Sequence, residues 1–296
     1  MRPIEHFPRD PQEAAALLPV FAGYNKIQGM LLCRALDLPT LPAIVINPAQ
    51  VSAEIALSAA RTIDPSRYLV RHDRAPETGS YPQGGYIVRS DEIEAELEWY
   101  RQQSRLIVLL SPADPLDNLY SASALLTSDN MLSIEVVGPG FDAGDLNRGF
   151  ISPLESYRFL LDDSGRTRFI GSSQLDAESY SVMKSLRIRK IALKYILKKR
   201  LFNLNELDEN QAIATLRSSP RTAQIQFRHL LSDEGYVKAP RKFLAELERF
   251  ASVMHRDANS RVAGEKMLAF SASQIDNSET TVVWDIVYPQ RKYALN

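Results

Sequence analysis

The spacing of hydrophobic and polar positions divides the first third of the chain into short helices and short strands. Residues 12–36 carry apolar side chains at helical spacing, and Pro19 and Gly23 mark a break between two helices. Short apolar, β-branched runs indicate strands at 41–48, 67–74, 84–91 and 105–110. Helical spacing returns between them at 51–63 and 90–103. This order predicts β-α-β units.

The rest of the chain is expected to contain two strand pairs separated by helices. Residues 119–127 and 131–138 have the pattern of two strands joined by a polar turn. Helical spacing dominates from 175 to 258. Residues 266–275 and 280–289 then indicate an antiparallel hairpin at the end of the chain. The chain as a whole is therefore expected to be a mixed α and β protein.

Composition narrows the possible environments and partners. The chain has 296 residues, 45% of them apolar, which is enough for one large core or two lobes. Lys and Arg number 35 against 36 Asp and Glu, so no global field recruits nucleic acid or an anionic membrane. Cys33 is the single cysteine, which excludes an internal disulfide framework and fits a reducing compartment. The first residues lack the apolar run of a signal peptide, so a cytoplasmic protein is expected.

The stretch 138–149 contains four glycines, two aspartates and Arg148 within twelve residues. Glycine allows the backbone to approach a ligand, and the guanidinium of Arg148 could grip a phosphate or a carboxylate. The stretch lacks both the Walker ending and the dinucleotide-binding spacing of glycines. An irregular loop with a β-bulge is the alternative interpretation, since glycine-rich turns mostly serve geometry.

Charged residues end the predicted strand 67–74. Alternation along a strand places Arg71 and Asp73 on one face and His72 and Arg74 on the other. A cation at the end of a buried strand is a plausible contact for a phosphate group. The alternative is a solvated strand end with a local ion pair, in which His72 is an ordinary surface histidine.

The final predicted strand carries a carboxylate between valines. Alternation groups Val282 with Trp284, Ile286 and Tyr288, and it groups Asp285 with Thr281, Val283 and Val287. If its face borders a cleft, Asp285 could bind magnesium, which takes oxygen ligands and usually bridges to substrate phosphates. Otherwise Asp285 is an ordinary acid at a strand end.

A basic amphipathic helix is predicted at 184–200. Leu186, Ile191 and Leu193 lie among eight basic residues there. Such a helix could bind nucleic acid, an anionic membrane or a protein partner, while a solvated helix face is the alternative. The four histidines are far apart in sequence and no Gly-x-Ser-x-Gly motif occurs, which disfavours hydrolases that use a catalytic triad and zinc proteases.

Several short sequence motifs resemble those of the ATP-grasp superfamily, including its phosphoenolpyruvate-synthase-like members. The first motif is Asn25-Lys26 on a helix, followed by residues 36–42 (Leu-Asp-Leu-Pro-Thr-Leu-Pro) and a strand. It is similar to the start of the ATP-grasp fold, where a helix that carries a lysine leads to a Gly-Leu-Pro-x-Pro turn. Residues 68–74 resemble the Val-Arg-Ser-Ser strand, with Arg71 at the arginine position and His72 and Asp73 in place of the serines.

The same resemblance implies roles for further residues, over about residues 20–290. Residues 106–112 look like the strand and linker that contact adenine through their backbone. Asp285 is similar in placement to the acidic residues that bind magnesium in this superfamily, although the usual Glu-x-Asn pattern is absent. The cofactors implied are ATP and Mg²⁺. The residues implied for nucleotide binding are Lys26, Arg71, Arg74, Leu109 and Leu110.

Together these features predict an α+β, ATP-grasp-like fold with two lobes, mixed or antiparallel sheets, and a helical segment before the C-terminal hairpin. The expected parts are an N-terminal segment at 1–48, a small α/β lobe at 49–112 and a larger lobe at 113–296. The expected function is an ATP-dependent ligase or kinase that activates a small acid, with Arg71 and Arg148 as catalytic residues. The alternatives are a non-catalytic nucleotide-binding protein and a protein that binds nucleic acid or a protein through 184–200. A homo-oligomer is also possible.

Overall fold

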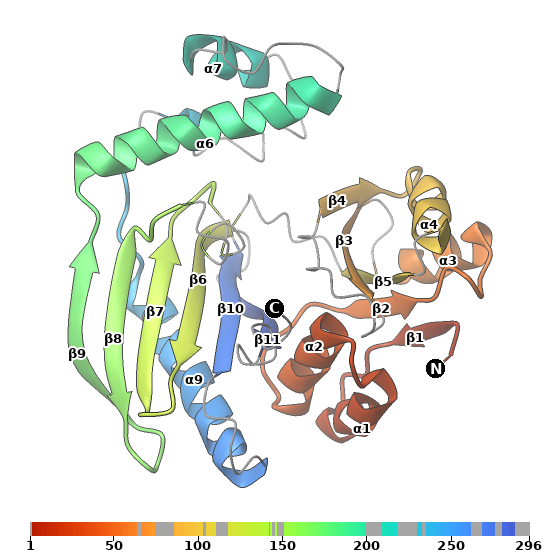
Figure 1. Ribbon diagram of the computed structural model, residues 1–296, viewed down its shortest axis with the longest axis horizontal. Helices are drawn as coiled ribbons and strands as arrows, with labels where there is room; N and C mark the ends of the chain where they lie inside the picture. The colour runs from red at the N-terminus through yellow and green to blue at the C-terminus, as the bar shows by residue number, and fades with distance from the viewer. Residues whose placement is uncertain are drawn as a thin grey trace.

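The computed structural model contains two antiparallel sheets with helices packed on them (Figure 1). It describes residues 2–63, 67–74, 86–102, 105–110, 118–141, 143, 146, 151–198, 209–217, 230–232, 235–261, 268–275 and 280–287. This arrangement confirms the α+β expectation. No helix in the described ranges combines the length and the apolar character needed to span a membrane.

The first sheet has five strands in the order β1-β2-β5-β3-β4, and all neighbouring strands are antiparallel. Its strands are β1 (Ile4–His6), β2 (Ala43–Ile46), β3 (Arg67–Arg74), β4 (Tyr86–Arg89) and β5 (Arg105–Leu110). Helices α3 (Ala53–Arg61) and α4 (Ile93–Gln102) share one core with this sheet. A second core, on its other face, includes side chains of α2 (Asn25–Ala35) and the 3₁₀ helix η1 (Leu18–Phe21). Helix α1 (Pro11–Leu17) lies against α2 (Figure 1).

The second sheet has six strands in the order β11-β10-β6-β7-β8-β9. Its strands are β6 (Asn118–Leu126), β7 (Met131–Val137), β8 (Glu155–Leu161), β9 (Thr167–Gln174), β10 (Leu268–Ile275) and β11 (Thr281–Val287). The long helix α9 (Arg241–Arg261) covers one face, where its apolar side chains join those of the sheet in the largest core. Helices α6 (Ala177–Lys198) and α7 (Glu209–Arg217) lie across one end of this sheet (Figure 1).

The predicted strand pairs are present, and the described residues also contain three strands that the pattern did not predict. The hairpin β10–β11 and the pair β6–β7 confirm the expectations for 266–289 and 119–138. The unexpected strands are β1, which pairs with β2, and β8 and β9, which pair with each other. The signal for β8 and β9 was available, because β8 alternates between buried and exposed positions and the turn after it contains Asp162 and Gly165.

Helix α2 joins the two sheets. Its residues Ile27 and Leu31 belong to the core of the first sheet, while Leu32 and Cys33 belong to the core of the second. Its backbone lies very close to β11, because a Cβ added at Gly29 would lie 2.3 Å from the carbonyl oxygen of Ile286. Only glycine fits at this crossing, so α2 fixes the distance between β11 and the first sheet.

Candidate functional site

The charged end of β3 faces the junction between the two sheets. Arg71, His72 and Asp73 are 8%, 1% and 5% exposed, so the alternative of a solvated strand end is wrong. Alternation is confirmed for these three residues. Arg71 contacts β11 and Asp73 contacts α2, while His72 contacts α4 on the opposite face. The buried charges of Arg71 and Asp73 require partners of opposite charge or hydrogen-bonding groups, because an unpaired buried charge costs several kcal/mol.

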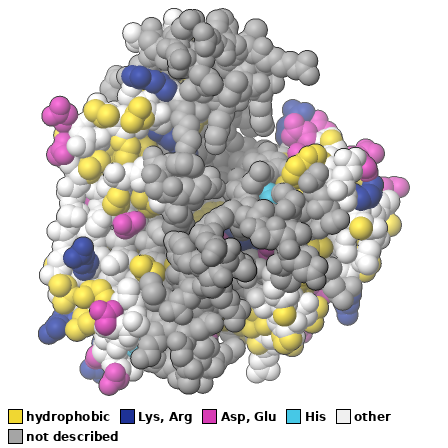
Figure 2. Space-filling view, in the orientation of Figure 1, with side chains coloured by type: hydrophobic (Ala, Val, Ile, Leu, Met, Phe, Trp, Pro, Cys, Tyr) yellow, Lys and Arg dark blue, Asp and Glu magenta, His cyan; other side chains and the backbone are white. Residues whose placement is uncertain are grey.

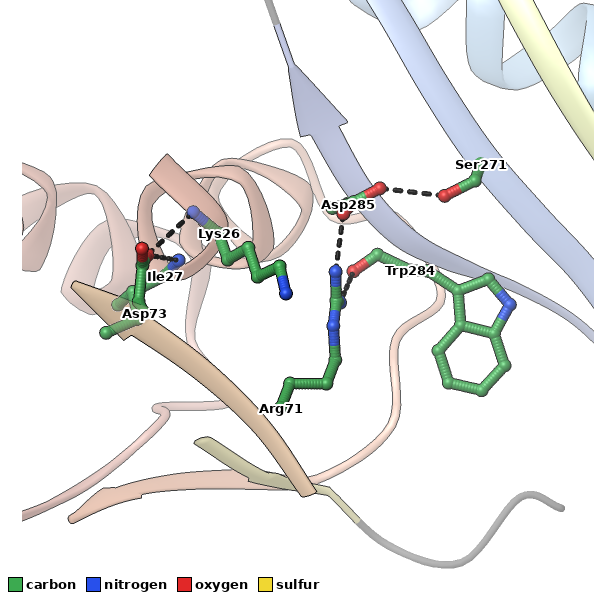
Figure 3. A network of polar contacts seen from close by, with 7 residues as sticks. All are labelled: Lys26, Ile27, Arg71, Asp73, Ser271, Trp284 and Asp285. Atoms are coloured by element: carbon green, nitrogen blue, oxygen red, sulfur yellow. Dashed lines mark hydrogen bonds and ion pairs between the residues drawn. The ribbon is translucent and has the colours of Figure 1, made fainter. Parts of the chain in front are cut away.

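Arg71 pairs with Asp285 across the two sheets. Its Nη2 donates to Asp285 Oδ2 at 2.5 Å, and its Nη1 donates to the carbonyl oxygen of Trp284 at 3.0 Å. The other carboxylate oxygen, Asp285 Oδ1, accepts from Ser271 Oγ at 2.7 Å. The two charged side chains are 10% and 17% exposed. The guanidinium therefore bridges β3 and β11 within a mostly buried network (Figure 3).

Asp73 caps the N-terminus of α2. Its Oδ2 accepts from the backbone nitrogens of Lys26 at 2.8 Å and of Ile27 at 3.2 Å. The local residue before the helix, Tyr24, makes no side-chain cap, so a strand distant in sequence supplies this function. A carboxylate at this position satisfies two free N–H groups and complements the positive end of the helix dipole.

Lys26 adds a second cation to the junction. It is 8% exposed, and Figure 3 shows its side chain extending from α2 toward Arg71. The junction thus holds two cations, Lys26 and Arg71, and two carboxylates, Asp73 and Asp285. The structure brings Lys26, Arg71 and Asp285 to this junction, although their helix and strands are far apart in the sequence.

A β-bulge on β11 corrects the predicted faces of the last strand. Ser271 pairs with Asp285 and Ala272 pairs with Val283, so Trp284 is the extra residue. Val283 and Ile286 consequently lie in the same core, where alternation had placed them on opposite faces. The bulge turns the carbonyl of Trp284 toward Arg71 and presents Asp285 beside it. An extra residue of this kind has no signature in the hydrophobic pattern.

Serines that the sequence analysis did not identify line the polar face of the second sheet. Ser273 Oγ lies 2.8 Å from Ser121 Oγ and accepts from the indole nitrogen of Trp284 at 2.7 Å. Ser271, two residues earlier on β10, donates to Asp285. The Ser-Ala-Ser repeats at 121–123 and 271–273 are the signal that could have indicated this face.

His72 is a structural residue rather than a surface histidine. Its Nδ1 lies 3.1 Å from the hydroxyl oxygen of Tyr100, which is fully buried on α4. The two rings are also in contact, with centroids 5.2 Å apart. This contact holds α4 against β3 on the face opposite to Arg71.

The remaining predicted nucleotide residues are placed by their backbone. Arg74 pairs with Arg105 at the end of β3, and its side chain is outside the described residues. Leu109 and Leu110 pair with both β2 and β3, so their backbone lies between two partner strands.

The glycine-rich stretch is described only in part. Arg148 lies outside the described residues. Gly140 has φ +82° and packs so closely that an added Cβ would lie 2.3 Å from Leu230 Cγ. Its carbonyl accepts from Nε of Arg187 at 3.3 Å. At Gly140 the glycine therefore serves geometry and packing.

The faces of helix α6 differ from those predicted for the basic helix. Leu186, expected among the apolar anchors, is 58% exposed, whereas Arg187 is 6% exposed. Lys184 Nζ donates to the carbonyl oxygen of Ser232 at 2.5 Å. The buried face runs through Met183, Arg187, Ile188 and Ile191. Arg187 and Lys184, which belong to the predicted basic face, thus make contacts within the chain.

The donor groups at the junction can be compared with those that a magnesium ion uses. Among the described residues, no group of three or more His, Cys, Asp and Glu side chains could form a complete metal site. Asp285 is the one carboxylate at the junction that does not cap a helix. Magnesium commonly uses one or two carboxylates together with phosphate oxygens, so Asp285 fits that mode of binding.

Comparison with known proteins gives similarity to solved structures only. No protein-family model matches the chain, and no curated protein matches it. One similar structure is D-alanyl-alanine synthetase A from Vibrio cholerae O1 biovar eltor, with 10% identity, a TM-score of 0.42, and coverage of 93% of this chain and 57% of the other. Another is the D-cycloserine synthetase DcsG, with 10% identity, a TM-score of 0.36, and coverage of 91% and 63%. The chain spans less than two thirds of the length of either synthetase.

Proposed function

We propose that this protein is an ATP-dependent ligase or kinase of the ATP-grasp type, which activates a small acid with the γ-phosphate of ATP. The observation that carries the proposal is the buried Arg71–Asp285 pair between the sheets, with Lys26 beside it. The resemblance of residues 25–42 and 68–74 to ATP-grasp sequence motifs supports the same conclusion. No observation favours the alternative at 184–200 to the same extent, since Lys184 and Arg187 make contacts within the chain.

Exchange of partners explains how one buried pair can serve a nucleotide. Without a ligand, Arg71 and Asp285 neutralise each other, which avoids the cost of an unpaired buried charge. A phosphate group offers the guanidinium an anion with the bidentate geometry that arginine favours. Asp285 is then available to a magnesium ion that travels with the nucleotide. Each charge remains paired in both states.

We assign roles from the chemistry of the residues and from the resemblance to ATP-grasp motifs, and the place of Lys26, Arg71 and Asp285 at the junction supports three of them. Lys26 and Arg71 bind phosphate oxygens and neutralise the charge that develops during phosphoryl transfer. Asp285 holds Mg²⁺, which supplies further charge neutralisation when bound. Arg74 gives another phosphate contact, and Leu109 and Leu110 contribute to the adenine site. Arg148 grips the acid substrate. Catalysis in this scheme comes from positioning and electrostatic stabilisation. The proposed location of the protein is the cytoplasm.

Isothermal titration with ATP, with and without magnesium, tests the proposal without knowledge of the acceptor. We expect magnesium-dependent binding by the wild-type protein. The double variant Arg71→Gln/Asp285→Asn removes both charges together and leaves polar amides in their place, so no unpaired charge remains buried; it should fold and bind ATP at least tenfold more weakly. Absence of binding by the wild-type protein at millimolar ATP would overturn the proposal.

A charge-matched control separates site binding from general electrostatic attraction. Arg89 and Asp91 form a second ion pair, with 64% and 63% of their side chains exposed on the first sheet and the turn after it. The variant Arg89→Gln/Asp91→Asn removes the same charges without touching the junction. It should bind ATP as the wild-type protein does, and an equal loss in both variants would contradict the assigned site.

A further inference from the structure

A groove lies at the edge of the six-stranded sheet that is formed by β8 and β9. It has a volume of about 670 Å³ and is formed by α9 and the turn between β8 and β9. The sheet order places β8 and β9 at the edge opposite to β11, so this groove is separate from the junction. The turn between β8 and β9 lies at the lower left of Figure 1. Basic and acidic side chains both appear at that corner in Figure 2.

Three arginines line this groove. Arg249 and Arg256 are seven residues apart on α9, which places them on one helix face about 10 Å apart along the axis. Arg166 approaches from the β8–β9 turn. All three are exposed, and none forms an ion pair with another residue in the described parts of the chain. Arg249 also lies 5.0 Å from the ring centroid of Phe250.

The carboxylates around these arginines are engaged elsewhere. Glu248, the single acid in the lining, accepts from Thr167 Oγ1. Asp162 accepts from the backbone nitrogens of Ser164 and Arg166, both at 2.9 Å, and from Ser164 Oγ at 2.6 Å. These bonds close the turn and hold the pKa of Asp162 below its usual value, chiefly through the Ser164 hydroxyl. The charge of Arg166 also lowers the pKa of Asp162, but neither carboxylate forms an ion pair with a groove arginine in the described part of the chain.

The floor of the groove is fixed by small residues. Ser252 Oγ donates to the carbonyl oxygen of Gly165 at 2.6 Å, which ties the turn to α9. Gly165 has φ +78°, and an added Cβ would lie 3.3 Å from the carbonyl oxygen of Ser252. Glycine thus permits the close approach of turn and helix. The three guanidinium groups therefore extend from a preformed surface.

We propose that this groove binds a small organic molecule that carries two or more phosphate or carboxylate groups. Arginine forks recognise both groups in bidentate fashion. Two guanidiniums about two helical turns apart favour separated anionic groups over a single small ion. The volume lies within the range of roughly 300–1,000 Å³ that is usual for small-molecule sites. This site is independent of the nucleotide site proposed at the junction.

Titration of the full chain with tripolyphosphate, citrate and inorganic phosphate tests this assignment. Tripolyphosphate or citrate should bind saturably and more tightly than inorganic phosphate, and the preference between them identifies phosphate or carboxylate as the group recognised. The variant Arg249→Gln/Arg256→Gln should weaken that binding at least tenfold. Arg249→Lys/Arg256→Lys, which keeps the charge and loses the fork, should give an intermediate affinity. Failure of both polyanions to bind the wild-type protein would overturn the proposal.

Two controls decide where the polyanion binds. Arg158 and Arg168 are exposed at the same edge of the sheet and outside the groove, so Arg158→Gln/Arg168→Gln removes the same charge and should leave binding unchanged. In titrations without magnesium, which the proposed nucleotide site requires, the junction variant Arg71→Gln/Asp285→Asn should also bind the polyanion normally. An equal loss with Arg158→Gln/Arg168→Gln would show non-specific attraction, and a loss confined to the junction variant would assign the polyanion to the nucleotide site. Either result rejects the groove.

Discussion

Asp285 and Glu155 are two of the carboxylates that are largely withdrawn from water, and their partners differ in kind. Asp285, at the junction of the sheets, is held by the guanidinium of Arg71 and the hydroxyl of Ser271. Glu155, on β8, is 1% exposed, and its hydrogen-bond donors among the described residues are neutral. Those donors are the hydroxyl groups of Tyr157 and Tyr236 and, at 2.7 Å, the backbone nitrogen of Ala239.

This difference separates a structural carboxylate from one that can take part in binding. The donors of Glu155 belong to packed residues, and their loss would leave a buried charge without hydrogen bonds. The pKa values of Tyr157 and Tyr236 are raised, first by burial and then by Glu155, so both hydroxyls stay protonated and remain donors. Arg71, in contrast, can exchange Asp285 for another anion if a ligand brings both charges.

Removal of the cation should have the largest effect on stability. Arg71→Ala leaves Asp285 mostly buried and without its charge partner, and we expect the free energy of unfolding to fall by about 3–5 kcal/mol. Urea denaturation followed by circular dichroism measures this change. Arg89→Ala breaks an exposed pair and should shift the urea midpoint little. Equal midpoints for the two variants would contradict the buried bridge between the sheets.

The sequence predicted the elements around the junction better than the contacts within it. Arg71 and Asp73 were assigned to one face of β3 because alternation is a local property. The partner of Arg71 lies 214 residues away, and its position depends on the bulge at Trp284. Burial of His72 likewise depends on Tyr100, which α4 brings to the opposite face. Pairings that span the chain leave no local periodic signal.

Removal of one neutral donor should have a smaller effect at Glu155. Tyr236→Phe deletes a hydrogen bond to a buried charge while two donors remain, so a loss of about 1–3 kcal/mol in unfolding free energy is expected. Tyr180→Phe is the control, since Tyr180 contacts the Tyr236 ring. Urea denaturation should show a clear shift for the first variant and little for the second. Indistinguishable midpoints would mean that the Glu155 network contributes nothing measurable to folding.

The smallest expected effect concerns the reactivity of Cys33, which reports on the junction without altering it. This thiol is fully buried on α2, and burial, followed by the charge of Asp285, raises its pKa well above the usual value. It should therefore react with a thiol reagent at pH 8 far more slowly in the native protein than in urea, because the thiolate is the reactive form. Arg89→Ala should leave the native rate unchanged, whereas Arg71→Ala should raise it by opening the contact between α2, β3 and β11. If Tyr236→Phe raised the rate more than Arg71→Ala, exposure of Cys33 would follow loosening of the large sheet rather than opening of the junction.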